Sequence, residues 1–201
     1  MECDAGIMTS IQSICVFCGS AAGADPSFLR AAQETGAWIV RQGLTLVYGG
    51  ARIGLMGALA DSALAAGGKV IGVIPRGLQE REIAHTGLTR LHLTETMHER
   101  QRMMTDLADA FLVLPGGYGT LAEFFEVLTW KQIGLHAKPI GVLNTGGYWD
   151  FLTAHLEKAG RAGFTRETDA GLYSVISDPS DISLLFREKI LGNGKVLHTI
   201  G

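Results

Sequence analysis

Short runs of apolar residues alternate along this chain with longer segments in which apolar side chains recur at helical spacing. The apolar runs have the length and β-branched content of buried strands, and glycine or proline bounds most of them. This alternation predicts one α/β domain, built as a doubly wound, Rossmann-like parallel sheet with helices on both faces. The expected strands are residues 13–18, 44–48, 69–74, 110–114, 139–143 and 173–177.

Capping residues mark where several of the helices begin and end. Asp25 is expected to cap a helix that starts at Pro26 and ends at Gly43, and Thr96 to cap a later one. Residues 76–95 are polar and irregular and are expected to form a loop, and a connection of that length often carries function. The other helices are expected over residues 53–66, 97–108, 119–134, 148–161 and 179–191.

The length of 201 residues is that of one ordinary domain. We expect a flexible N-terminus over 1–12, the folded domain over 13–192 and a C-terminal tail over 193–201. The net charge of −3 and the scattered Lys and Arg residues argue against a nucleic-acid partner. No apolar run approaches a membrane span, and Glu2 and Asp4 stand where a signal peptide would need basic residues, so we expect a cytoplasmic protein.

The three cysteines, Cys3, Cys15 and Cys18, are too few and too odd in number for a disulfide framework. Cys15 and Cys18 form a Cys-x-x-Cys, which would suit a redox protein. They fall on a predicted strand, however, where positions three apart face opposite sides, so their thiols should diverge. The six histidines show no paired spacing typical of a metal site, and we expect no metal.

Residues 111–126 run an apolar strand into a glycine-rich turn and then into a helix. Three glycines in this turn let the backbone approach an anion closely, and the start of the helix offers unpaired N–H groups and the positive end of a dipole. The segment therefore predicts a phosphate site. Glu123 lies beside it, where it could reach a bound ribose or only complement the helix dipole.

Three predicted strands end in glycine, at Gly19, at Gly49-Gly50 and at Gly116-Gly117. Loops at the carboxyl ends of parallel strands can converge on one crevice, where such sheets bind ligands. A dinucleotide-binding dehydrogenase is excluded by its own fingerprint, because no Gly-x-Gly-x-x-Gly follows the first strand and no acidic residue ends the second. The site suits one phosphate and one nucleoside.

Pro115 to Glu123 resembles the Pro-Gly-Gly-x-Gly-Thr-x-x-Glu motif of the LOG ("lonely guy") family and matches it at every fixed position. Members of this family are cytokinin riboside 5′-monophosphate phosphoribohydrolases, often labelled lysine decarboxylases. A second family signature is Met-x-x-Arg-Lys; Met97 and Arg100 match it, and Gln101 stands in place of the lysine. Glutamine can donate a hydrogen bond but brings no charge. The resemblance spans roughly residues 13 to 178.

The resemblance implies that Arg100 and Glu123 are the catalytic pair, where an arbitrary arginine would be a solvated charge paired with Glu99 or Asp106. It also implies a homodimer with the cleft near the interface. The chain shows no convincing site for a pyridoxal cofactor, which disfavours a lysine decarboxylase, and we expect no cofactor. The residues that it places around the substrate and its phosphate are Gly19, Ser20, Gly49, Gly50, Glu82, Met97, Gln101, Gly116, Gly117, Tyr118, Gly119, Thr120 and Thr129.

The implied reaction hydrolyses the N-glycosidic bond of a cytokinin or adenine riboside 5′-monophosphate to free base and ribose 5-phosphate. Two alternatives stay open on the sequence. One is a broader purine monophosphate nucleosidase acting on AMP, which differs only in the base pocket. The other is a nucleotide or molybdenum-cofactor binding protein without hydrolysis.

Overall fold

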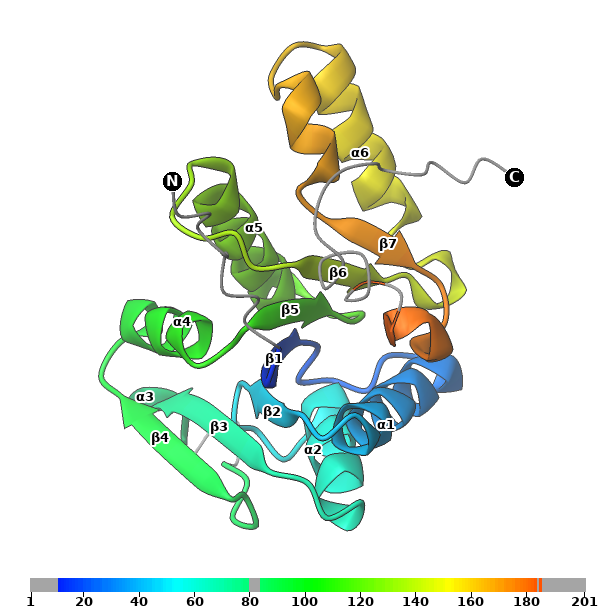
Figure 1. Cartoon of the computed structure of the whole chain (residues 1–201). Coiled ribbons are helices and arrows are strands. Elements are labelled where there is room, and N and C mark those ends of the chain that lie inside the picture. The colour runs from blue at the N-terminus through cyan, green and yellow to red at the C-terminus, as the bar shows by residue number, and fades with distance from the viewer. Residues whose placement is uncertain (1–10, 80–83, 184, 186–201) are drawn as a thin grey trace, which may run out of the picture.

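The computed structural model describes residues 11–79, 84–183 and 185, and within them seven strands form one parallel sheet in the order β4-β3-β2-β1-β5-β6-β7 (Figure 1). The predicted termini 1–12 and 193–201 lie wholly or almost wholly outside these residues. The strands are β1 (Ser13–Phe17), β2 (Thr45–Tyr48), β3 (Val70–Pro75), β4 (Arg90–Thr94), β5 (Ala110–Val113), β6 (Ile140–Leu143) and β7 (Ser174–Ile176).

Helices cover both faces of the sheet, as the alternating pattern predicts (Figure 1). On one face α1 and α2 pack tightly on each other, and on the other face α4, α5 and α6 lie over the sheet. The helices are α1 (Pro26–Arg41), α2 (Gly54–Ala65), α3 (Arg76–Gln79), α4 (Met97–Asp106), α5 (Tyr118–Gln132) and α6 (Asp150–Arg161), with three short 3-10 turns η1 (Thr145–Gly147), η2 (Glu167–Gly171) and η3 (Pro179–Asp181).

The central strands are apolar on both sides, because each side faces a layer of helices. In β1, Ile14 and Val16 pack into the core beneath α1 and α2, while Cys15 and Phe17 pack into the core beneath α4 and α5. Cys18 lies in the first of these cores and Cys15 in the second, and both thiols are free. The prediction that the two thiols diverge is confirmed.

The predicted caps are confirmed at two helices. The Asp25 carboxylate accepts a hydrogen bond from the Ser27 N–H at 2.8 Å, one residue into α1. At α4, the Thr96 hydroxyl accepts from the Glu99 N–H at 3.1 Å. Both side chains thereby satisfy N–H groups that the first helical turn leaves without partners.

The prediction that residues 76–95 form a loop is wrong. This segment contains the short helix α3 and the whole of β4, which pairs with β3 from Ile71↔Arg90 to Pro75↔Thr94. β4 lies at the edge of the sheet, begins with an exposed Arg90 and mixes polar with apolar residues, so it lacks the apolar run of a central strand. The helix expected over 179–191 begins instead with η3, and its part beyond residue 185 lies outside the described residues.

From β1 the chain adds β2, β3 and β4 on one side of the sheet and then β5, β6 and β7 on the other. The strand order therefore reverses between β1 and β5. Ligands of open α/β sheets bind outside the carboxyl ends of the strands at such a switch point. Gly19 follows β1 and Gly116 follows β5, so the glycine turns predicted to bind phosphate flank this point.

Candidate active site

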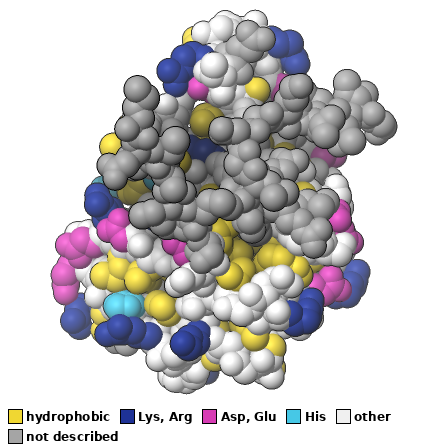
Figure 2. Space-filling model, viewed as in Figure 1, with side chains coloured by type: hydrophobic (Ala, Val, Ile, Leu, Met, Phe, Trp, Pro, Cys, Tyr) yellow, Lys and Arg dark blue, Asp and Glu magenta, His cyan; other side chains and the backbone are white. Residues whose placement is uncertain are grey.

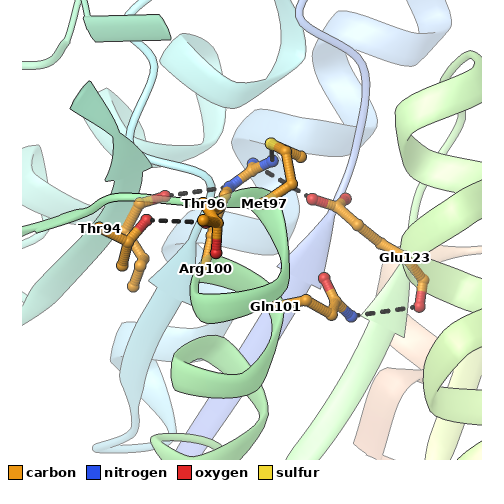
Figure 3. Close-up of polar contacts among 7 residues, drawn as sticks. Thr94, Thr96, Met97, Arg100, Gln101 and Glu123 are labelled. Atoms are coloured by element: carbon orange, nitrogen blue, oxygen red, sulfur yellow. Dashed lines mark hydrogen bonds and ion pairs between the residues drawn. The ribbon is translucent and has the colours of Figure 1, made fainter. Parts of the chain in front are cut away.

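Arg100 reaches across the carboxyl end of the sheet and is held by groups from two other elements (Figure 3). Its Nε donates to the Val73 carbonyl in β3 at 3.2 Å, and its Nη2 lies 3.1 Å from Glu123 Oε1 on α5. Its Nη1 lies 4.0 Å from the Met97 sulfur. It is Arg102, not Arg100, that pairs with Asp106 on the exposed side of α4, so Arg100 is not the solvated helix charge of the simpler interpretation.

Glu123 is the sixth residue of α5, beyond the first turn, and its residue exposure is only 8 %. That placement disfavours the interpretation that its charge only complements the helix dipole, because the dipole effect fades within the first turn. The Arg100–Glu123 ion pair is buried on both sides. Since removing two charges from water costs about as much as their attraction returns, such a pair is weak evidence for stability.

Gly49, at the end of β2, makes room for the arginine. A Cβ atom on residue 49 would overlap Arg100 Nη2 and come within 2.8 Å of the Met56 sulfur. Gly50 follows with φ of +80°, a conformation that favours glycine. Gly49 therefore provides the surface on which the guanidinium lies.

The loops after β1 and β5 contact each other directly. The Gly19 N–H donates to the Pro115 carbonyl at 3.1 Å, and a Cβ on Gly116 would come within 2.8 Å of Gly19 N and overlap the Thr120 hydroxyl. The Gly19 carbonyl also accepts hydrogen bonds from the N–H groups of Leu55 and Met56, which begin α2. The three glycine loops thus meet at one place, as their position at strand ends predicts.

Of the helix N-termini around this place, that of α5 is open to a ligand. A side chain caps α1 and another caps α4, and the Gly19 carbonyl occupies the first N–H groups of α2. Within the described residues, no side chain accepts from the first turn of α5, whose N-cap is Gly117. Gly117, Tyr118 and Gly119 are exposed there, so their N–H groups can bind an anion.

The other predicted residues lie at varying distances from this centre. Gln101 is buried, and its Nε2 donates to the Glu123 main-chain carbonyl at 3.4 Å, which ties α4 to α5 (Figure 3). Met97 and Ser20 are exposed at the rim. Thr129 is exposed on α5, about 120° around the helix axis from Glu123, so it does not extend the face that carries the pair. Glu82 lies outside the described residues.

The two thiols nearest the site are not available as nucleophiles. Burial, and then the negative charge of Glu123, raise the pKa of both Cys15 and Cys18 above the usual thiol range. A thiol that stays protonated neither attacks a sugar nor exchanges with a disulfide. Among the described residues, no group of three His, Cys, Asp or Glu side chains is placed to hold a metal ion.

Tyr148 is a residue of this region that the sequence did not reveal. Its hydroxyl donates to the Gly116 carbonyl at 2.6 Å from the loop after β6. The only sequence signal is topological, because β6 lies beside β5 and the loops after neighbouring parallel strands share an edge.

Comparison with known proteins gives concordant matches. Residues 56–184 match the family described as "possible lysine decarboxylase". The chain is 49 % identical over 154 residues to the cytokinin riboside 5′-monophosphate phosphoribohydrolase of Rhodococcoides fascians, covering 76 % of this chain and 78 % of the relative. It is 44 % identical over 174 residues to the cytokinin riboside 5′-monophosphate phosphoribohydrolase LOG1 of Arabidopsis thaliana, covering 87 % of this chain and 81 % of the relative.

Solved structures share the fold at lower identity. The molybdenum cofactor binding protein of Rippkaea orientalis superimposes with a TM-score of 0.69 at 21 % identity, over 90 % of this chain and 99 % of that one. The molybdenum cofactor carrier protein of Chlamydomonas reinhardtii gives a TM-score of 0.69 at 23 % identity, over 91 % of this chain and all of its own. These likenesses establish the architecture.

Proposed function

Because this chain belongs to the LOG family of cytokinin riboside 5′-monophosphate phosphoribohydrolases, we propose that it hydrolyses the N-glycosidic bond of a cytokinin riboside 5′-monophosphate. The products are the free base and ribose 5-phosphate. The observation that carries the proposal is the buried Arg100–Glu123 pair beside the open N-terminus of α5. A carboxylate and an anion site on the same helix suit a sugar phosphate that reacts at its anomeric carbon.

Glu123 acts on the sugar and the water. As the bond from C1′ to the base nitrogen breaks, its electrons go to the base and positive charge develops on the sugar, as in glycoside hydrolysis. The Glu123 carboxylate stabilises that charge and orients the water whose oxygen bonds to C1′. The attacking water loses one proton to a proton acceptor, and the departing nitrogen of the nucleobase gains one proton.

Arg100 orients both partners of the reaction. A guanidinium has five N–H donors in a rigid fork. One of them binds Val73, a second faces Glu123 and a third faces Met97, which leaves two for a ligand within the described part of the chain. We assign those donors to a ribose hydroxyl or the leaving base, and a lysine could not make the same set of contacts.

The phosphate serves as a handle. Its binding at the start of α5 spends remote binding energy on placing the ribose over Glu123, so monophosphates react faster than nucleosides. The Gly116–Thr120 turn supplies the N–H groups. We assign Gly19 and Ser20 to the same cleft, because the Gly19 N–H donates to the Pro115 carbonyl beside this turn.

The test is release of free base from isopentenyladenosine 5′-monophosphate and from AMP by the wild type and Glu123→Gln. We expect the wild type to release base and the variant to lose at least about a hundredfold in kcat, the range of a lost acid–base group. Glu126→Gln, the same change one turn further along α5, is the matched control and should keep activity. The faster substrate separates a cytokinin-specific enzyme from a purine monophosphate nucleosidase.

No release from either substrate, with nucleotide binding intact, would contradict the hydrolase and favour a carrier that binds without reaction. Equal loss in Glu123→Gln and Glu126→Gln would contradict the role of Glu123 and point to a general effect on α5.

We also propose a homodimer in a reducing, cytoplasmic compartment. Large apolar side chains are exposed, above all Phe151, Phe164, Leu135 and Ile133. On the face seen in Figure 2, hydrophobic side chains also reach the surface over β3 and β4 and over α1. Exposed apolar area of this kind favours self-association.

The free, buried thiols suit a reducing compartment. Within the described residues, no helix is long and apolar enough to cross a membrane.

A further inference from the structure

Tyr148 is joined to the Gly116–Thr120 turn, the turn proposed to bind phosphate, by a short hydrogen bond. Its hydroxyl donates to the Gly116 carbonyl at 2.6 Å, across 32 residues of sequence. The contact is at the surface, with Tyr148 42 % exposed, and therefore it does not serve to satisfy a buried polar group. Neither the motif nor the family resemblance includes this residue.

The tyrosine ring is held in place independently of its hydroxyl. Its edge packs against Phe28 of α1, with ring centroids 5.3 Å apart at 76°, and against Trp149 at 4.6 Å. The loop beneath it is fixed by the Asn144 side chain, whose Oδ1 accepts from the Trp149 N–H at 2.6 Å. Asn144 N–H in turn donates to Ile176 in β7 at 2.7 Å. The hydroxyl is thus presented to the turn from a rigid support.

The turn that it contacts has two possible orientations. Gly116 and Gly117 are joined by one peptide unit, and with no Cβ on either side that unit can rotate at little steric cost. In a trans peptide the C=O and the N–H point in opposite directions. When the Gly116 carbonyl is bound to Tyr148, the Gly117 N–H therefore points away from the tyrosine.

The Gly117 N–H belongs to the open group at the start of α5, because Gly117 is the N-cap of that helix. If the peptide turned over, the Gly116 carbonyl would take the place of this N–H and present a negative oxygen to an anion. One peptide orientation therefore attracts phosphate and the other repels it.

We propose that Tyr148 is a positioning residue for the substrate phosphate: its hydroxyl holds the Gly116–Gly117 peptide so that the Gly117 N–H faces the anion. The inference rests on the proposed function only in identifying that anion as the 5′-phosphate of a nucleotide. Tyr148 does not touch the reacting atoms. It acts through the turn, so its effect falls on monophosphate binding and not on the glycosidic bond.

The test is Tyr148→Phe, which removes one oxygen and keeps the ring packing. Binding of AMP and of adenosine is measured by calorimetry on the same preparations. We expect AMP to bind about three- to tenfold more weakly, the range that one net hydrogen bond is worth, and adenosine to bind unchanged. Where turnover is measurable, KM for the monophosphate rises by the same factor while kcat changes less than about twofold.

Tyr173→Phe is the matched control, because it removes a tyrosine hydroxyl from a ring that packs on Phe124 and the core around it, and not one bound to the Gly116 carbonyl. It should leave both affinities unchanged. Unchanged AMP affinity in Tyr148→Phe would overturn the inference. So would an equal loss for AMP and adenosine, since that would indicate a distorted cleft in place of a lost phosphate contact.

The two proposals fail separately. If the wild type releases no base but binds AMP more tightly than adenosine, the hydrolase proposal is contradicted. The AMP affinity of Tyr148→Phe then still tests whether Tyr148 positions the turn for the phosphate. If the wild type binds AMP no more tightly than adenosine, there is no phosphate site for Tyr148 to position, and the inference is overturned whatever the turnover.

Discussion

The Arg100 guanidinium lies where a side chain on residue 49 would be, so the Arg100–Glu123 ion pair depends on a missing Cβ atom. Arg100 is fixed on its other sides by Val73 and by Glu123. Any group added at residue 49 must therefore displace the arginine from one of these partners, since protein interiors do not yield space without cost.

We predict that Gly49→Ala lowers kcat by at least about tenfold while the protein stays folded. The added methyl group moves Nη2 away from Glu123, and a small misplacement of a catalytic group is costly. Base release and circular dichroism are measured together. Gly171→Ala is the control, because a Cβ there meets no atom within 4 Å. Activity in Gly49→Ala equal to that of the control would contradict the dependence on this glycine.

At the scale of elements, the end of α5 is tied to the segment after α6 by hydrogen bonds, among them one to the carboxylate of Asp169. Gln132 Nε2 donates to Asp169 Oδ2 at 2.7 Å, and the Arg166 N–H donates to the same oxygen at 2.9 Å. These hydrogen bonds, first that of Gln132, lower the pKa of Asp169 below the usual carboxyl range. The hydrogen bonds to Asp169 are therefore strongest while its carboxylate is ionised, whereas the bond from Arg166 Nη2 to the Gln132 carbonyl, at 3.1 Å, does not depend on that charge.

We predict that the contribution of Asp169 to this tie is lost in acid. A carboxyl whose pKa is lower in the folded state contributes stability above its unfolded pKa, about 3.9, and loses it as the pH falls through the folded pKa. The difference in melting temperature between wild type and Asp169→Asn should therefore be positive at pH 7 and shrink below about pH 4. A difference that stays constant down to pH 3 would contradict the prediction.

The elements that the sequence predicted well are those with a strong local signal. Buried strands such as β1 and β5 are continuous apolar runs, and Asp25 and Thr96 are caps that act on the next three residues. β4 has no such signal, because an edge strand is half exposed and carries Arg90 and His92. Its identity is decided by pairing with β3, which no short window of sequence contains.

At the scale of the molecule, the place of the site was predictable and several of its contacts were not. Glycine loops at strand ends and the rule for switch points locate the edge of the sheet where Arg100 and Glu123 meet. The contact of Gly49 with Arg100 and that of Tyr148 with Gly116 join residues far apart in the chain. They depend on side-chain directions that become defined only when the sheet is assembled.

We predict that the protein is a dimer in solution. Light scattering coupled to size-exclusion chromatography should give twice the chain mass of 21.4 kDa, because the exposed apolar side chains gain from being covered. A single-chain mass that persists as the concentration rises tenfold would contradict the dimer.

The position of β1 in the middle of the sheet has a consequence for synthesis. The pairing of β1 with β2 begins at Ser13↔Thr45, but its pairing with β5 begins at Ile14↔Ala110, and Ala110 follows Ile14 by almost a hundred residues. A ribosome takes on the order of ten seconds to supply that second partner, and during this time one edge of an apolar strand is unpaired. Unpaired edges recruit other chains. The nascent N-terminal half is therefore the form most exposed to aggregation and most in need of a chaperone.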